Sequence, residues 1–376
     1  MGQPWQGGGG YEQHRPPVNP RPQTRGMPDQ RGYAPTASYR PGGRPPGGGP
    51  PPAPPRRRRR WRIRRIIGVL LVLLLVGAGV MWFYMDSSLH RVNALVEYPT
   101  RPVQGSGTNW LVVGSDSRQG LTDAQAAQLH TGDAAAVSGG RTDTIMLVHL
   151  PDNSTKPTMV SLLRDSLVSI PGHGNNKINA AYAFGGPALL VQTVEQATGL
   201  RIDHYAEIGL GGFASVVDDV GGVTMCLPQA VQDSFAGINL PAGCQTLNGA
   251  NALGYVRSRH AFATSDFART QHQREFLGAL AGRITSPGVL LNPFELFPVL
   301  FDLPGNLTVD NGDHLQDLIG LGWSMRGISN GSLVTTAVPI GGSSGGSLLW
   351  DKAKSKELFN DLNTDQAVPS SLITNA

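Results

Sequence analysis

One uninterrupted apolar run near the N-terminus constrains this chain more than any other feature. Residues 66–84 read IIGVLLVLLLVGAGVMWFY, 19 positions without a charged side chain. A helix of this length crosses the hydrocarbon core of a bilayer, which is about 30 Å thick. The sequence therefore predicts a single transmembrane helix over residues 66–85, and it favours a membrane span over the buried helix of a soluble protein.

The charges beside this run predict which way the chain crosses the membrane. Eight arginines precede it (Arg56 to Arg60, Arg62, Arg64 and Arg65), whereas the first charge after it is Asp86. The positive-inside rule then places the N-terminus in the cytoplasm and everything after about residue 86 outside. No cleavage motif follows, so we expect a retained signal anchor in the cell membrane. The arginines could also bind anionic lipid, or they could serve orientation alone.

The segment before the span has the composition of a disordered tail. Residues 1–65 hold 14 of the 31 basic residues and 15 of the 29 prolines, and their net charge is about +12 against −8 for the remainder. Such a segment buries too little apolar surface to offset the entropy lost on ordering. We predict a disordered tail (1–65), a linker (86–104), one outer domain (105–365) and a C-terminal tail (366–376). Nucleic-acid binding by the tail is disfavoured because orientation and lipid contact explain its charge.

Strand-length and helix-length patterns alternate in the outer domain. This alternation predicts an α/β fold with a mostly parallel or mixed central sheet between helical layers, and functional residues at strand ends. The expected strands are 110–114, 144–150, 158–162, 205–208 and 223–227, and the expected helices are 187–198, 212–219, 266–284, 314–325 and 350–362.

Two cysteines, Cys226 and Cys244, enclose a short loop of the outer domain. In an extracytoplasmic compartment they could form a disulfide worth about 3 kcal/mol, and the alternative is two unrelated buried thiols. Two cysteines without a Cys-x-x-Cys pair exclude a zinc ribbon and a disulfide-dense scaffold.

Opposite charges stand beside three of the predicted strands. One alternative is that each Asp caps a turn and each Arg is its salt-bridge partner. The other is a site in which Asp116 and Asp143 hold Mg²⁺, which prefers one or two carboxylates plus phosphate oxygens, while arginines bind phosphate through their planar fork. The charges in question are those of Asp116, Arg118, Arg141, Asp143, Arg164 and Asp165.

A second polar cluster follows at residues 256–273. Arg257 and Arg259 point the same way only if their stretch is extended, which leaves 249–255 as a helix. Asp266, Arg269 and Gln273 then share one face of the next helix. A solvated polar face is the plain alternative, but the two arginines just before it favour a poly-anionic ligand.

These motifs, in this order, resemble the LytR-CpsA-Psr family over about residues 105–285. The matching segments are Gly-Ser-Asp-Ser-Arg at 114–118, Arg-Thr-Asp-Thr-Ile-Met at 141–146, Arg-Asp-Ser at 164–166, Lys-Ile-Asn-Ala-Ala-Tyr at 177–182, Asp-Asp-Val-Gly-Gly-Val at 218–223 and Ala-Leu-Gly-Tyr-Val-Arg-Ser-Arg at 252–259, followed by Asp266, Arg269 and Gln273.

The resemblance implies a phosphotransferase that moves an anionic glycopolymer from a polyprenyl diphosphate carrier to peptidoglycan, at the 6-hydroxyl of muramic acid. It implies Mg²⁺, or Mn²⁺ in its place, held by Asp116 and Asp143, and a polyprenyl chain in an apolar groove. Asp266 would orient arginines or act as base, a role for which Asp116 is the other candidate. The tail's composition suggests a high-GC Gram-positive source and arabinogalactan as the polymer. The diphosphate would be held by Arg118, Arg141, Arg164, Lys177, Arg257, Arg259, Arg269 and Gln273.

Two other functions compete with this one. A polyprenyl diphosphate phosphohydrolase would use the same site with water as the acceptor. A non-catalytic regulator or wall anchor would use the arginines only to bind anions. The paired Asp116 and Asp143 argue against the regulator, because an anion-binding patch gains nothing from carboxylates unless a metal bridges them.

A second apolar segment, residues 288–303, lies late in the chain. Its content of Val, Leu and Phe predicts packing beneath the sheet, since apolar residues are usually core residues. Contact with the lipid groove or with the bilayer is the alternative.

Overall fold

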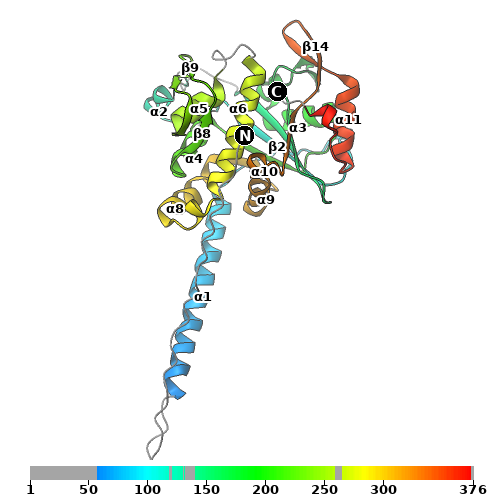
Figure 1. The fold of residues 1–376 in the computed structure, drawn as a ribbon. Helices are drawn as coiled ribbons and strands as arrows, with labels where there is room; N and C mark the ends of the chain where they lie inside the picture. Colours follow the sequence, from blue (N-terminus) through cyan, green and yellow to red (C-terminus); the bar gives the residue numbers. More distant parts are fainter. Residues whose placement is uncertain (1–56, 118–120, 130, 132–139, 259–264, 374–376) are drawn as a thin grey trace, which may run out of the picture. The chain divides into compact units, whose positions relative to one another are not determined.

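The structure is a computed structural model that describes residues 57–117, 121–129, 131, 140–258 and 265–373, with the backbone alone for 57–60 and 265–270. The chain divides into two compact units, Met1–Arg62 and Ile63–Ala376, and the second contains the folded domain. Its first element is the helix α1 (Arg57–Ser87), whose apolar part from Trp61 to Ser87 is long enough to cross a membrane (Figure 1). The prediction of one candidate transmembrane helix is confirmed.

The outer domain is built on a seven-stranded mixed sheet, as predicted. Its strands lie in the order β1 (His90–Val92), β12 (Leu307–Asp310), β7 (His204–Ile208), β2 (Thr108–Ser115), β3 (Thr142–Leu150), β4 (Thr158–Ser161) and β13 (Val334–Ala337). The pairs β1–β12, β7–β2 and β4–β13 are parallel, whereas β12–β7, β2–β3 and β3–β4 are antiparallel.

Helices cover both faces of the sheet because successive strand residues point to opposite sides. Leu111 and Val113 of β2 pack with α3 (Ile178–Thr198) and α11 (Lys352–Asn363). Trp110, on the other face, packs with α6 (Ser265–Ile284), α9 (Leu315–Met325) and α10 (Gly327–Asn330). The predicted α-β-α layering is therefore confirmed (Figure 1).

A third cluster of buried side chains lies beside the sheet and continues the core. It packs α4 (Leu210–Asp219) and α5 (Gly249–Arg257) against α6. Two hairpins close it, β8 (Val223–Leu227) with β11 (Gly243–Leu247), and β9 (Val231–Asp233) with β10 (Ile238–Leu240). The remaining elements are α2 (Asp123–Gln128), β5 (Leu167–Ile170), β6 (Gly174–Lys177), α7 (Pro287–Leu290), α8 (Pro293–Asp302), β14 (Ile340–Ser344), β15 (Ser347–Trp350) and the short 3-10 helices Pro304–Asn306 and Ser370–Leu372.

The folded domain extends beyond the expected limits at both ends. Residues 86–104, expected as a linker, contribute β1 to the sheet, and the Asp310 carboxylate accepts the N–H groups of Ala94 and Leu95. Leu372, in the expected C-terminal tail, is buried in the core. Both segments are too short to show periodicity in the sequence, and their placement depends on partners far along the chain.

Helix α3 begins earlier than predicted. The sequence indicated a start at Pro187, but the chain is already helical from Ile178, and Gly185 and Gly186 break the helix just before the proline. Gly186 has a φ of 63°, a conformation that glycine adopts without steric cost. Pro187 therefore starts the second half of a kinked helix.

The two cysteines face each other across the β8–β11 hairpin and are joined by a disulfide. The bond closes a loop of 18 residues, so replacing both cysteines by serine should lower the free energy of unfolding by about 3 kcal/mol. Chemical denaturation of the two proteins measures the difference. The matched control removes the exposed Thr224–Thr246 hydroxyl pair of the same hairpin by alanine substitution, with an expected cost of about 0.2–1 kcal/mol. Equal costs in the two double variants would contradict a covalent contribution.

Asp219, at the end of α4, makes stability depend on pH. Burial, followed by repulsion from Asp302 and Asp218, raises the pKa of Asp219 to about 6 from 3.8. The unfolded chain therefore ionises first, and the native state loses stability as the pH rises from 3.8 through 6. We expect Asp219→Asn to increase the free energy of unfolding by about 1–2 kcal/mol above this range, after allowance for solvent screening.

The gain should vanish at pH values below 3.8, where the carboxyl is protonated in both states. Denaturant unfolding at the two ends of the pH range measures it. Glu357→Gln, on the exposed face of α11, serves as the control and should change stability equally little at both pH values. A gain in Asp219→Asn that persists in acid would show that charge is not its cause.

Candidate active site

A cavity of about 350 Å³ opens at one edge of the sheet. It lies where β2 and β7 end and β3 begins, and α4, α5 and α6 form its far wall. Its lining has an apolar part and a polar part, and the polar part is called the rim below. The apolar part includes Val112, Val113, Ile208, Leu210, Phe213, Phe235, Leu253, Val256 and Leu277, and the polar part includes Ser115, Asp116, Asp143, Asp233, Arg257 and Gln273.

Strand direction explains why three separate motifs meet at this edge. β3 runs antiparallel to β2, so the first residues of β3 lie beside the last residues of β2, and Ser115 pairs with Thr142. β4 runs antiparallel to β3, which returns its C-terminal end to the same edge and places Arg164 there. The expectation that these charges gather where strands end thus has a direct topological basis.

Asp116 is held against the start of β3 by its side chain and its backbone. Its Oδ1 accepts the backbone N–H of Arg141 at 2.5 Å, and its own N–H donates to the Arg141 carbonyl at 2.9 Å. These bonds fix the carboxylate at the cavity wall. The Arg141 side chain is exposed and does not line the cavity.

A chain of alternating charges begins at the cavity wall and leads away from it. Its members are Asp143, Arg164, Asp165 and Lys177. Arg164 Nη1 lies 2.7 Å from Asp143 Oδ1, and Arg164 Nε lies 3.3 Å from Asp165 Oδ2. Lys177 Nζ continues the chain at 2.7 Å from Asp165 Oδ1. The Arg164 side chain is 18 % exposed and does not line the cavity, whereas its partner Asp143 does.

The second predicted cluster reaches the same cavity in a different local structure. Arg257 was expected in an extended stretch, but it is the last residue of α5, and the chain becomes extended at Ser258. The helix thus ends two residues later than predicted, and the Ser258 N–H donates to the Tyr255 carbonyl at its end. Gln273 of α6 is buried, and its Nε2 donates to the Val256 carbonyl at 3.1 Å. Both Arg257 and Gln273 line the cavity.

Four predicted residues lie wholly or partly outside the described part of the chain. Arg118 and Arg259 belong to the gaps 118–120 and 259–264. Asp266 and Arg269 are described by their backbone in α6, where they and Gln273 occur at i, i+3 and i+7 on one helical face. Their predicted roles stay predictions.

Two further residues that line the cavity, and one in the adjoining strand β7 (His204–Ile208), had no sequence motif to reveal them. Asp233 is buried, and its Oδ1 accepts the N–H groups of Phe235 and Ala236. This bonding holds the tight β9–β10 turn, which presents Phe235 at the cavity while leaving it 77 % exposed.

Glu207 of β7 is buried beneath the rim and accepts hydrogen bonds from the hydroxyls of Tyr182 and Tyr205 at 2.7 and 2.6 Å. A charged residue in the apolar strand His204–Ile208 was the only signal for it.

Tyr182 links this buried glutamate to the rim. Burial, followed by the charge of Glu207, holds the pKa of the Tyr182 hydroxyl well above its ordinary value. The phenol therefore remains protonated at physiological pH and donates to Glu207. A Cβ at Gly140 would lie 3.3 Å from Tyr182 and 3.6 Å from Asp116 Oδ1, which places both side chains beside the same backbone segment.

The donor set at the rim fits a divalent cation. Asp116 and Asp143 supply carboxylate oxygens from adjacent strands to one cavity, the ligand type that Mg²⁺ prefers when substrate phosphates complete its shell. The backbone N–H of Arg141 donates to Asp116 and orients its carboxylate, as the hydrogen-bond partners of metal ligands commonly do.

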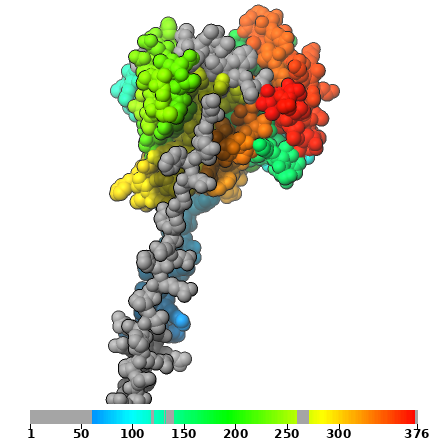
Figure 2. Space-filling model, viewed as in Figure 1, coloured from blue at the N-terminus to red at the C-terminus, as the bar shows by residue number. Residues whose placement is uncertain are grey.

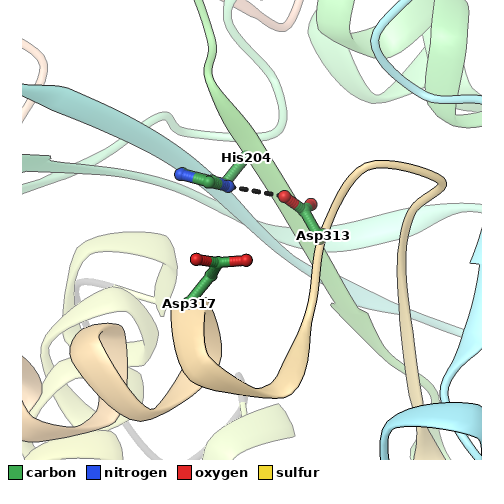
Figure 3. A group of neighbouring side chains, drawn as sticks. All are labelled: His204, Asp313 and Asp317. Carbon is green, nitrogen blue, oxygen red and sulfur yellow. Dashed lines mark hydrogen bonds and ion pairs between the residues drawn. The ribbon is translucent and has the colours of Figure 1, made fainter.

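Another group of possible metal ligands, His204, Asp313 and Asp317, lies elsewhere in the described domain. Figure 3 shows the His204 ring directed at Asp313, and the ring nitrogen Nδ1 lies 2.5 Å from its Oδ1. The other Asp313 oxygen accepts the N–H groups of Tyr205 and Asp310. Because its oxygens already bind protein groups, we interpret this cluster as a structural tie between β7 and the turn after β12.

Comparison with known proteins shows which family this chain matches. The LytR_cpsA_psr family model matches residues 87–364, which include the whole sheet and every rim residue. The chain belongs to the LytR-CpsA-Psr family. The match also begins at residue 87, in agreement with the position of β1 inside the fold.

Relatives within the LytR-CpsA-Psr family are named for cell-wall synthesis. The chain is 49 % identical over 302 residues to a probable cell wall biosynthesis protein LcpB of Corynebacterium glutamicum, covering 79 % of this chain and 70 % of that protein. It is 32 % identical over 277 residues to the polyisoprenyl-teichoic acid–peptidoglycan teichoic acid transferase TagU of Oceanobacillus iheyensis, covering 67 % and 78 %. The solved LytR-Csp2A-Psr enzyme from Actinomyces oris aligns with a TM-score of 0.58 at 25 % identity, covering 73 % of this chain and 96 % of that one.

Proposed function

We propose that this protein is a phosphotransferase that ligates an anionic glycopolymer to peptidoglycan. The donor is a polyprenyl diphosphate-linked glycan, and the acceptor is the 6-hydroxyl of muramic acid. One observation carries the proposal, which is a single cavity whose lining combines an apolar wall with Asp116, Asp143, Arg257 and Gln273. An apolar wall beside convergent charged groups suits a ligand that is lipid at one end and poly-anionic in the middle.

The names of the relatives support the same reaction class. TagU of Oceanobacillus iheyensis is named as a transferase of teichoic acid from a polyisoprenyl carrier to peptidoglycan, and LcpB as a cell wall biosynthesis protein. The composition of the tail suggested a high-GC Gram-positive source, and on that ground we propose arabinogalactan as the polymer to test first.

The proposed reaction forms one bond and breaks one. The acceptor hydroxyl oxygen attacks the glycan-bearing phosphorus, the bond to the bridging oxygen breaks, and polyprenyl phosphate leaves. The protein mainly has to align the hydroxyl and neutralise the diphosphate. Arg257 would bind phosphate oxygens at the rim, and Arg164 and Lys177 would add positive charge from behind Asp143. Arg118, Arg141, Arg259 and Arg269 remain proposed contacts of the same diphosphate.

Mg²⁺, or Mn²⁺ in its place, held by Asp116 and Asp143 would neutralise charge on the diphosphate when bound. A carboxylate that binds a metal is a poor base. We therefore propose Asp266 as the group that removes the acceptor proton.

The test uses the full-length protein in lipid nanodiscs, with Mg²⁺, a radiolabelled polyprenyl diphosphate glycan and uncross-linked peptidoglycan. Label transferred to the acceptor supports the proposal. Release of free glycan phosphate would instead establish the phosphohydrolase, which uses water at the same site. Binding of the lipid without turnover over a range of acceptors would establish a non-catalytic regulator.

The membrane topology completes the proposal. We propose that α1 crosses the cytoplasmic membrane with the Arg-rich tail inside, which places the cavity on the side where peptidoglycan lies. Protease added to intact cells should then cleave the outer domain and spare a tag fused to the N-terminus. The reverse pattern would contradict the orientation.

A further inference from the structure

The apolar segment 288–303 does not pack beneath the sheet as the sequence predicted. Leu291 is 82 % exposed, and Phe294, Phe297 and Phe301 of α8 are 88 %, 49 % and 39 % exposed. The three phenylalanines stand at i, i+3 and i+7, so they share one face of the helix. The opposite face rests on α4, and Val299 is buried there. In Figure 2 this segment, in yellow, stands out from the surface of the domain.

Helix α9 carries a second exposed apolar pair. Ile319 and Trp323 are 53 % and 62 % exposed and stand four residues apart on one face. Leu321 and Met325 are buried against the sheet. The Arg326 guanidinium lies 4.5 Å from the Trp323 ring centre. Trp is enriched at membrane–water interfaces, and the long side chain of Arg can extend its charge to the headgroups there.

Both helices contact the C-terminal end of α1. The rings of Tyr84 and Phe301 are 5.8 Å apart, which joins α1 to α8. The Asp86 carboxylate accepts the N–H of Leu315 at 2.9 Å, which joins α1 to the first turn of α9. Arg91 holds the same carboxylate at 2.7 Å. The candidate membrane helix therefore ends between the two exposed apolar faces (Figure 1).

We propose that α7, α8 and α9 form a membrane-docking surface, made of Leu290, Leu291, Phe294, Phe297, Phe301, Ile319 and Trp323, that lies in the interface of the bilayer crossed by α1. The occupant is lipid, because the surface continues directly from a helix whose side chains from Ile66 to Val80 are already exposed for lipid contact. An amphipathic helix of this kind inserts about 5–10 Å into the boundary between headgroups and acyl chains.

This surface is separate from the cavity. None of its residues lines the cavity, and α8 packs on α4, which forms part of the cavity wall. Docking would fix the tilt of the domain at the point where α1 leaves the bilayer. The inference depends on α1 as the span and does not depend on the proposed chemistry.

The test measures the surroundings of single side chains in the full-length protein. Both native cysteines are joined in the disulfide, so one added cysteine can carry a spin label selectively. Phe294→Cys and Trp323→Cys probe the two helices, and Ser343→Cys, exposed on the β14–β15 hairpin, is the matched control. Each protein is placed in vesicles of phosphatidylethanolamine and phosphatidylglycerol. Collisions with oxygen, which concentrates in lipid, are compared with collisions with a water-soluble nickel complex.

We expect the ratio of oxygen to nickel collisions to be severalfold higher at both probe positions than at Ser343→Cys. A ratio equal to the control at both positions would place the surface in water and overturn the proposal. Low access to both reagents would also overturn it, because a second copy or another protein would then cover the surface. The two labelled positions lie on different helices, so failure of one variant to fold leaves the other as the test.

Discussion

Arg164→Ala is expected to lower kcat/KM for transfer of the glycopolymer by about 100-fold, because Arg164 orients Asp143 and adds positive charge behind the rim, and a misplacement of about 1 Å at a reactive group costs roughly that much. Arg164 is held between the carboxylates of Asp143 and Asp165, at 2.7 and 3.3 Å, so its orientation is set before substrate binds. Initial rates with the labelled polyprenyl diphosphate glycan measure the loss.

Two control variants separate the effect of Arg164 from a general loss of folding. Arg201→Ala breaks an exposed ion pair with Glu97 at 2.8 Å, and its rate should stay near that of the unaltered protein. Arg164→Lys retains the charge but loses the planar fork, so an intermediate rate is expected. A variant Arg164→Ala with an unchanged rate would reduce the Asp143–Arg164 pair to a structural salt bridge, the alternative that the sequence left open.

The central strands were predictable because their signal is local. β2 and β3 are runs of apolar and β-branched residues whose length and flanking polar residues identify them without any knowledge of their partners. Strand β1 contains only three residues, His90 to Val92, and it is a strand because Thr308 to Asp310 pairs with it more than 200 positions later. No local pattern carries that information.

The residues of the candidate site also differ in whether a local sequence signal identifies them. Asp116 and Asp143 were predicted to act together because each stands beside the end of a recognisable strand, and the structure adds that these strands are neighbours. Asp233 and Glu207 were missed because their roles come from contacts that the fold creates, the β9–β10 turn and the hydroxyls of two tyrosines.

The apolar segment 288–303 shows a different limit of sequence reasoning. Its composition predicted packing in the core, which is wrong, because composition does not distinguish core residues from an exposed apolar surface. The decisive information is that Phe301 contacts Tyr84 at the end of the candidate membrane helix, a contact between residues more than 200 positions apart. Apolar helices late in a chain with a signal anchor therefore merit comparison with the end of the anchor.

Removal of the divalent cation should abolish transfer. Treatment with EDTA is expected to stop turnover, and added Mg²⁺ or Mn²⁺ should restore it, because two carboxylates at one anion-binding rim otherwise repel the diphosphate. Asp116→Asn and Asp143→Asn retain the side-chain shape and lose the charge. Each should lower kcat/KM on the order of 100-fold at limiting Mg²⁺, consistent with several kcal/mol of charge stabilisation by a bound metal. Rates measured as a function of Mg²⁺ concentration give the comparison.

Asp317→Asn is the matched control for these variants, because it makes the same chemical change in the other group of possible metal ligands. Asp317 accepts the His314 N–H at the start of α9, and an amide oxygen can replace it in that bond. Its Mg²⁺ dependence should equal that of the unaltered protein. If Asp317→Asn shifted the Mg²⁺ requirement while Asp116→Asn and Asp143→Asn did not, the metal would belong to the His204 cluster. If transfer continued in EDTA, Asp116 would act by holding the Arg141 backbone and Asp143 by orienting the Arg164 side chain, the contacts they already make.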